Sequence, residues 1–206
     1  YTLKDGDNDT STATLTIAIG DSTPTNVIPD AGGLTTTVYE AGLPARGGEP
    51  AGSDSAANSE TVAGTVAFTS LDGLSAVSLG GHALTLVDQT FSDGLTARYS
   101  YNAATGAGVI TYSYTLADNT LGDNTTASFA VVVTDADGDS APAGNLVINI
   151  VDDVPTARAD TDSVASGSFV AATGNVITAA GTTSGAAGVD TLGADSAKVS
   201  QVASNN

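Results

Sequence analysis

The sequence predicts an all-β protein built as an antiparallel β-sandwich. Three observations support this prediction. Apolar and polar residues alternate with a period of two in several short segments, which is typical of strands with one buried face. Turn-forming pairs such as Asp-Gly and Gly-Gly separate these segments. No segment shows a sustained helical stripe with capping residues at its ends.

Strands are expected where this alternation is sustained. The clearest candidates span 14–19, 97–101, 109–116 and 146–150. Weaker candidates lie near 35–39, 62–69, 75–79 and 83–88. Residues 128–133 form a continuous apolar run instead, which predicts a strand buried on both faces.

Turns and one long loop are expected between these strands. The turn signals are Asp72-Gly73, Gly80-Gly81, Asp93-Gly94 and the stretch 102–106. Residues 41–59 are poor in apolar side chains and rich in Gly, Pro and Ser, so they predict a long loop. Residues 157–206 are also rich in Gly, Ala and Ser, and their few apolar side chains fit the opening of a further module.

The chain carries a strongly negative charge. Its 23 acidic residues outnumber the 5 Lys and Arg, which gives a net charge of −18 at pH 7. Twenty of the acids are Asp and only three are Glu. Asp is the shorter side chain, favoured in turns and as a ligand of hard cations. A chain with so few basic residues cannot neutralise phosphates, so no nucleic acid partner is expected.

Several absences in the sequence exclude other classes of protein. The chain has no Cys, which excludes disulfides, zinc–thiolate sites and thiol catalysis. It has no run of about 18 apolar residues, so no membrane insertion is expected. Its first residues lack the apolar core of a signal peptide. A secreted protein without disulfides needs another stabilising cross-link, and a metal ion is the usual substitute.

An internal repeat organises the chain. The acidic segments 5–9 and 135–139 lie 130 residues apart, and the strand-and-linker segments 15–25 and 146–156 lie 131 residues apart. The second pair shares Leu, Ile, Ile, Asp, Pro and Thr at matching positions. Residues 1–3 also match a later segment, but that register aligns neither the acidic loop nor the linker.

The repeat predicts three parts. Residues 1–25 form the C-terminal end of a preceding module, 26–156 a complete Ig-like module, and 157–206 the start of a following module. Pro24 and Pro155 restrict the backbone at the two junctions.

The Asp-x-Asp-x-Asp motif at 5–9 and 135–139 suits calcium chemistry. Carboxylates at alternate positions of a tight loop can converge on one cation, and calcium takes about 6–8 oxygen ligands. Neither motif is an EF-hand, because Gly138 occupies the fourth position rather than the sixth and no Glu stands at the twelfth. A solvated acidic turn is the alternative interpretation. Two copies in register, together with the excess of Asp, favour a calcium site.

Several segments resemble a known type of repeat. Residues 131–140 and 145–157 are similar to the end of a repeat in the giant RTX adhesins, bacterial proteins exported by type I secretion. Residues 38–43 are similar to a stretch near the start of that repeat. Residues 174–176 and 189–195 resemble the opening of the next cadherin-like or Ig-like module. The acidic loop with its Asp-Asp-x-Pro linker is the most specific part of a resemblance that covers nearly the whole chain.

The resemblance implies an extender module with calcium ions at the module junctions. At the second junction the implied ligands are Asp135, Asp137, Asp139, Asp152 and Asp153, with Asp160 and Asp162 able to contribute from the next module. At the first junction they are Asp5, Asp7, Asp9 and Asp21, with Glu40 contributed by the following module. The first linker has one acid where the second has two, so the first site is expected to be the weaker.

These features predict a non-enzymatic, calcium-stiffened extender of a large secreted adhesin. Its expected location is extracellular, on the bacterial cell surface, with a role in cell adhesion and biofilm formation. Its expected partners are neighbouring modules of the same chain. One alternative is a ligand-binding module for a sugar or a partner cell, which the alternating Tyr99, Tyr101, Tyr112 and Tyr114 could serve. Another is a fibre or surface-layer subunit that self-associates when its ends complete neighbouring chains.

Overall fold

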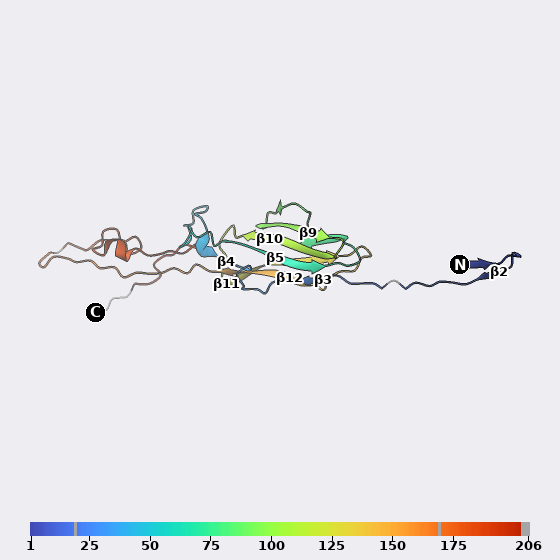
Figure 1. Ribbon diagram of the computed structural model, residues 1–206. Coiled ribbons are helices and arrows are strands. Elements are labelled where there is room, and N and C mark those ends of the chain that lie inside the picture. The colour runs from blue at the N-terminus through green and yellow to red at the C-terminus, as the bar shows by residue number, and fades with distance from the viewer. Residues whose placement is uncertain (19, 169, 203–206) are drawn as a thin grey trace.

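The computed structural model describes residues 1–18, 20–168 and 170–202. Within these residues the protein is all-β, as the sequence predicts, with two five-stranded sheets and a separate two-stranded hairpin. Figure 1 shows the two sheets stacked in the middle of an elongated molecule. The hairpin lies at one end of the molecule and residues 157–202 lie at the other.

The first sheet is antiparallel throughout. Its order is β3 (Thr25–Val27), β5 (Thr61–Thr69), β10 (Ala107–Thr115), β9 (Leu95–Asn102) and β8 (Gln89–Thr90). The long strand β10 is the centre of this sheet, since it pairs with β5 over its whole length and with β9 over most of it. The stretch 102–106 makes the turn between β9 and β10, as predicted.

The second sheet contains one parallel pair. Its order is β4 (Thr37–Tyr39), β12 (Gly144–Val151), β11 (Asn124–Thr134), β6 (Ala76–Leu79) and β7 (His82–Ala83). The edge strand β4 runs parallel to β12, with Tyr39 beside Val151. The two strands therefore end at the same end of the sandwich, and the residues that follow them, Glu40 and Asp152, start from neighbouring positions.

The core lies between the two sheets and is filled by their alternating inner residues. Val66 and Ile110 from the first sheet and Leu146 and Ile148 from the second are all fully buried. Tyr112 is also buried, and its hydroxyl donates a hydrogen bond to the carbonyl of Thr35 at 2.8 Å. A buried phenol needs such a partner, so this bond ties the chain before β4 to the opposite sheet.

Most of the expected strands are confirmed, but three expectations are wrong. The apolar run 128–133 belongs to β11, where Val131 is 1% exposed but Val132 is 40% exposed, so only one face is buried. Residues 84–88 form the loop between β7 and β8 rather than a strand. Residues 13–18 lie outside any strand, with Leu15 and Ile17 exposed, and Ile19 of the same expected strand lies outside the described residues.

The two ends of the molecule differ in structure. The N-terminal hairpin pairs β1 (Thr2–Lys4) with β2 (Thr10–Thr12), and it lies apart from the sandwich (Figure 1). Residues 157–202 contain one short 3-10 turn, Gly185–Gly188, and one bridge residue, Thr191, which pairs with Thr156. The rest of the part described is irregular. No helix among the described residues is long and apolar enough to span a membrane.

Candidate metal centres at the two ends of the sandwich

The antiparallel pairing of β11 and β12 separates two sets of acids that the sequence analysis placed at one junction. The loop 135–139 lies between the end of β11 and the start of β12, whereas Asp152 and Asp153 follow the far end of β12. Eight residues in β12 span roughly 27 Å at about 3.4 Å per residue. One cation therefore cannot bind both sets within one copy of the module, and that grouping is wrong.

The loop 135–139 is built around a buried carboxylate. Asp135 is fully buried, and its Oδ1 accepts hydrogen bonds from the backbone N–H of Gly138 at 3.0 Å and of Asp139 at 2.7 Å. Gly138 has a φ of 109°, which a residue with a side chain rarely adopts. Asp135 Oδ2 is buried without a partner among the described residues. A carboxylate oxygen of each of Asp135, Asp137 and Asp139 lies within 4.8 Å of the others.

The N-terminal hairpin repeats this loop geometry. The N–H of Asp5 donates to the carbonyl of Asp9 at 3.0 Å, and Asp5 Oδ1 accepts from the N–H of Asp9 at 2.8 Å. Asn8, with a φ of 78°, takes the place of Gly138. The strand pair that flanks this loop also recurs 130 residues later: Lys4 opposite Thr10, then Thr134 opposite Ser140. The repeat seen in the sequence is thus a repeat of backbone structure.

The three acids of the hairpin loop are all exposed. Asp5, Asp7 and Asp9 bring one carboxylate oxygen each within 4.8 Å of one another. The pKa of Asp5 lies below its usual value, first because its carboxylate shares a hydrogen bond with the Asp7 side chain and then because the N–H of Asp9 donates to it. This loop can hold a cation only from the solvent side.

Asp21 lies with a different set of acids from the one expected. One carboxylate oxygen each of Asp21, Asp72 and Asp137 lies within 4.8 Å of the other two. Asp72 belongs to the turn after β5. The N–H of Ser22 donates to Asp72 Oδ2 at 2.6 Å, which fastens the linker to that turn. Asp72 was not among the expected ligands, because the Asp72-Gly73 pair is typical of a turn. The linker acid and the loop 135–139 thus meet at the N-terminal end of the sandwich.

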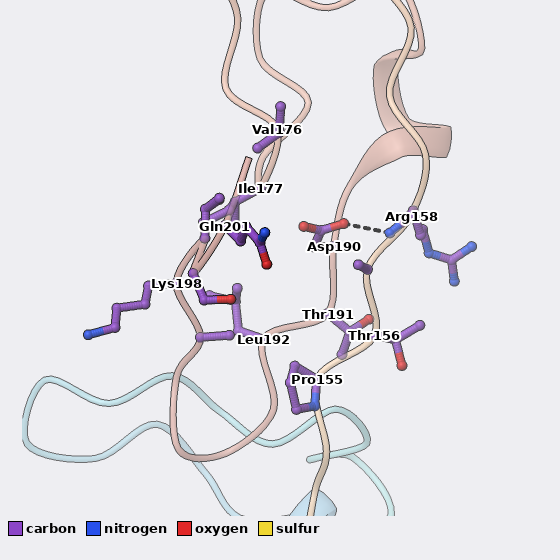
Figure 2. Close-up of a pocket in the computed structure, with 14 residues that line it drawn as sticks. Pro155, Thr156, Arg158, Val176, Ile177, Asp190, Thr191, Leu192, Lys198 and Gln201 are labelled. Atoms are coloured by element: carbon purple, nitrogen blue, oxygen red, sulfur yellow. Dashed lines mark hydrogen bonds between the residues drawn. The ribbon is translucent and has the colours of Figure 1, made fainter. Parts of the chain in front are cut away.

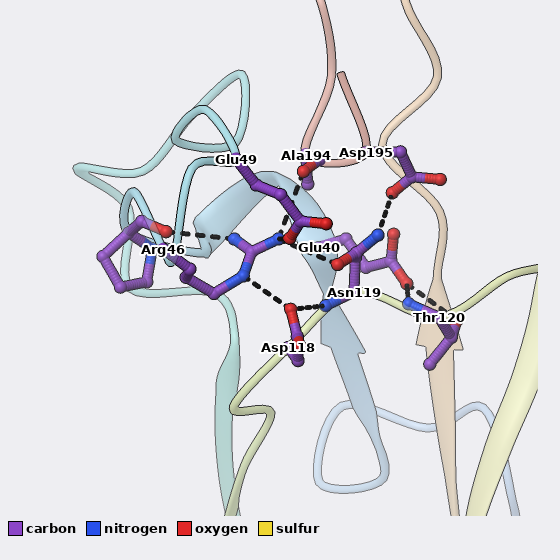
Figure 3. A network of polar contacts seen from close by, with 9 residues as sticks. Glu40, Arg46, Glu49, Asp118, Asn119, Thr120, Ala194 and Asp195 are labelled. Carbon is purple, nitrogen blue, oxygen red and sulfur yellow. Dashed lines mark hydrogen bonds and ion pairs between the residues drawn. The ribbon is translucent and has the colours of Figure 1, made fainter. Parts of the chain in front are cut away.

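The C-terminal end of the sandwich holds the most enclosed acidic group. Glu40 begins the 3-10 turn Glu40–Gly42 directly after β4 and is fully buried. Its Oε1 accepts hydrogen bonds from the N–H of Thr120 at 2.7 Å and from the Thr120 hydroxyl at 2.8 Å (Figure 3). Its Oε2 is buried without a partner among the described residues. Carboxylate oxygens of Asp152 and Asp195 lie within 4.8 Å of Glu40 and of each other.

The electrostatics of Glu40 reflect this position. Burial raises its pKa above the usual value, because the charged form loses its hydration. The two hydrogen bonds from Thr120 act in the opposite direction, and the negative charges of Asp195 and Asp152 raise the pKa further. A cation between the three carboxylates would relieve both the desolvation and the repulsion.

The acids at this end differ from those expected in two respects. Glu40 was expected at the first junction with Asp5 and Asp21, but the parallel pairing of β4 with β12 places it at the opposite end, beside Asp152. Asp195 was missed, although the segment 189–195 had been recognised as a module opening. Its spacing from the other two acids carries no local motif, so only the fold brings it to the site.

The remaining predicted ligands have other surroundings. Asp153 is 7% exposed, and its carboxylate accepts hydrogen bonds from the N–H of Ser53 at 2.7 Å and from the Ser53 hydroxyl. Asp160 Oδ1 accepts from Ser184 at 2.6 Å, and Asp162 accepts from the N–H of Ser163 at 2.8 Å. None of these three carboxylates belongs to an acidic group of the described residues.

The two ends share one further feature. Thr25 pairs with Thr69 at the start of the sandwich, and Asp72 follows in the next turn. Thr156 pairs with Thr191 in the same antiparallel sense, and Asp195 follows. At one end Asp21 of the linker lies beside Asp72, and at the other end Asp152 lies beside Asp195. In both cases the second acid comes shortly after the threonine that pairs with the linker threonine.

Two other candidate sites are weaker. An open cavity of about 370 Å³ lies among residues 155–158, 176–177, 190–192 and 197–201. Asp190 points into it but accepts a hydrogen bond from the N–H of Arg158 at 2.7 Å (Figure 2). The tyrosines of β10 form no exposed platform, because Tyr112 and Tyr114 are 2% and 7% exposed.

Comparisons with known proteins give no family for the chain. No family profile and no curated protein matches it. Among solved structures, the chain is similar to a mutant of the SrpA adhesin from Streptococcus sanguinis, with 14% identity and a TM-score of 0.39. The match covers 79% of this chain and 78% of that one. At this TM-score the similarity is too low to transfer either a fold or a function.

Proposed function

We propose that this chain is a calcium-stiffened structural extender of a large secreted bacterial surface adhesin, without enzymatic activity. The observation that carries the proposal is the group Glu40, Asp152 and Asp195, with the bare Glu40 Oε2 buried in it. The three acids come from the end of the sandwich, the linker and the C-terminal segment. A cation bound there would connect all three parts.

Calcium is the cation that this group suits best. All three ligands are carboxylates, and hard oxygen ligands favour calcium or magnesium over the transition metals. The site combines a rigid buried Glu40 with an exposed Asp195, an uneven set that suits the flexible coordination of calcium better than the strict octahedron of magnesium. The resemblance of the acidic loop and linker to the RTX adhesin repeats supports the same ion.

A calorimetric titration tests the proposal. Chelated, metal-free protein should bind calcium with release of heat or protons and gain melting temperature by mass action. Glu40→Gln should weaken this binding, because it removes the buried charge while keeping the shape of the side chain. Asp54→Asn is the matched control, since it removes one charge from an exposed residue of the neighbouring loop 41–59. No calcium binding by the wild type, or equal loss in both variants, would contradict the proposal.

A fibre subunit is the second candidate, because one segment carries an unburied apolar face. Leu15 and Ile17 are 73% and 74% exposed, yet they match Leu146 and Ile148, which are buried in β12. If the segment completed a sandwich in a neighbouring copy, these side chains would be buried there. Analytical ultracentrifugation over a range of concentrations would show a mass that grows with concentration. A monomer at every concentration, with and without calcium, would exclude this candidate.

A further inference from the structure

We infer that loop 44–49 and residues 118–120 form a docking surface that holds the segment 189–195 against the sandwich without a metal ion, with Arg46 as its anchor. The inference goes beyond the proposed function and stands whether or not calcium binds. It rests on a network of hydrogen bonds and ion pairs around one largely buried guanidinium, shown in Figure 3.

The backbone of a tight turn positions Arg46. Arg46 and Glu49 form an antiparallel bridge in which each N–H donates to the carbonyl of the other. Gly47 and Gly48, with φ of 41° and 111°, make the reversal between them. The turn thereby directs the Arg46 side chain inward, where it is only 12% exposed.

The guanidinium uses all three of its nitrogens. Nη1 donates to the carbonyl of Pro44 at 3.0 Å, and Nε donates to Asp118 Oδ1 at 2.8 Å. Nη2 lies 3.1 Å from Glu49 Oε2 and 3.0 Å from Asn119 Oδ1. The same Nη2 lies 3.1 Å from the carbonyl oxygen of Ala194, in the C-terminal segment. The planar guanidinium spreads its five donors over three nitrogens, so it serves acceptors on three segments at once.

Asn119 extends the network to the acidic group. Its Oδ1 accepts from Arg46, and its Nδ2 donates to Asp195 Oδ1 at 2.8 Å. The amide orientation is therefore set by the guanidinium, and Asp195 is held by a neutral donor in the absence of any cation. Arg46 is in this sense a positioning residue for Asp195.

The docked segment packs closely as well. Ala194 is fully buried and belongs to the same apolar cluster as the sandwich core. Gly193 has a φ of 75°, and a Cβ at that position would lie 2.1 Å from the carbonyl oxygen of Asp153. The segment 189–195 thus contacts the sandwich through close apolar packing as well as through hydrogen bonds and ion pairs.

The charge of Arg46 is already engaged without calcium. Arg46 lowers the pKa of Asp118, first through its hydrogen bond to that carboxylate. In a chain with 5 basic residues against 23 acidic ones, a guanidinium at this end also offsets part of the repulsion among the acids. Without this positive charge, the carboxylates of Glu40, Asp152 and Asp195 would repel one another more strongly across the contact.

Spin-label distances on the full chain test the inference. The chain has no Cys, so Thr65→Cys on β5 and Ala187→Cys in the C-terminal segment place two labels on exposed residues. In chelator the otherwise wild-type protein should give one narrow distance distribution, and Arg46→Ala should broaden it. Arg46→Lys should broaden it too, because the single nitrogen of an ammonium cannot reach acceptors that lie around three separate guanidinium nitrogens. Arg98→Ala, which breaks an exposed ion pair with Asp88 on the sandwich, should leave it unchanged.

Hydrogen exchange gives a second readout that needs no label. The N–H of Thr191 donates to the carbonyl of Thr156 at 3.0 Å, so its protection reports docking. Arg46→Ala should speed its exchange roughly tenfold or more in chelator, since hydrogen bonds to charged groups are among the stronger ones. Asn119→Ala, which removes one of the acceptors of Arg46 together with the link to Asp195, should have a smaller effect of the same sign. This variant also carries the test if Arg46→Ala fails to fold.

The outcomes separate the two proposals. We call the contacts of Arg46 and Asn119 with Ala194 and Asp195 the Arg46 clasp. A narrow distance distribution in folded Arg46→Ala would overturn the inference. A broad distribution in the wild type in chelator would overturn it too. Calcium titration of the same proteins reports independently on the acidic site. If the wild type binds no calcium but Arg46→Ala still broadens the distance, the proposed function fails and the inference stands.

Discussion

Glu40 lies at the buried end of the sandwich with one carboxylate oxygen bonded by Thr120 and the other bare. Its pKa is raised in the folded protein, chiefly by burial. Between the usual pKa and this raised value, the folded protein binds more protons than the unfolded chain. The free energy of unfolding contributed by Glu40 is therefore present at low pH and is lost as pH rises through the raised pKa.

Metal-free protein should consequently respond to pH through this residue. In chelator, the wild type should lose stability as pH rises through the raised pKa of Glu40. Glu40→Gln should remove that part of the pH dependence and raise the melting temperature of the chelated protein at pH 7, because a neutral amide is cheaper to bury than a charge. Melting curves in chelator at several pH values measure this. Equal pH profiles for the two proteins would show that Glu40 does not titrate as described.

The neighbouring acids of the second linker should have separable roles. Asp153 is bonded by Ser53, whereas Asp152 faces Glu40 and Asp195. We expect Asp153→Ala to lower the free energy of unfolding by about 1–3 kcal/mol, because it removes two hydrogen bonds to a buried charged group. Asp152→Asn should change stability in chelator little and weaken calcium binding. Chemical denaturation measures the stability of both variants, and calorimetry measures their calcium binding. Weaker calcium binding in Asp153→Ala together with lower stability in Asp152→Asn would contradict these roles.

The strand hairpins are the elements on which the sites depend. In the β11–β12 hairpin, Asp135 accepts from two backbone N–H groups and so holds its loop closed without an ion. Asp135→Ala should therefore destabilise the protein by about 1–3 kcal/mol in chelator as well as in calcium. Asp137→Ala, a change of an exposed residue in the same loop, is the control and should matter less in chelator. Equal losses from both changes would argue against the buried role of Asp135.

For the individual elements, the sequence predicted local structure well but did not predict which strands pair. Alternation predicted the strands around 97–101 and 109–116, and the repeat predicted that 5–9 and 135–139 share a loop. Period two cannot distinguish a strand from extended chain without a partner, so 14–18 was expected to be a strand although the described structure leaves it unpaired. The site depends on a parallel β4–β12 pair, which no local signal predicts. Without that pairing, Glu40 could not be placed beside Asp152.

The whole molecule is an elongated sandwich with a segment at each end (Figure 1). The proposed extender role requires the joints between these parts to be stiff. We propose two couplings at the C-terminal joint. One is the proposed cation among Glu40, Asp152 and Asp195, and the other is the Arg46 clasp on Ala194. Because they share Asp195 through Asn119, their effects on the joint should not simply add.

Small-angle scattering on the full chain tests this arrangement. Wild type should be extended in calcium and only slightly more variable in chelator, where the clasp remains. Arg46→Ala should stay extended in calcium and become clearly more variable in chelator, since both couplings are then lost. Asp152→Asn combined with Arg46→Ala should resemble that chelated state in either buffer. If chelator makes the conformations of the wild type as variable as those of Arg46→Ala, the cation alone stiffens the joint. The Arg46 contacts would then contribute packing but no stiffness.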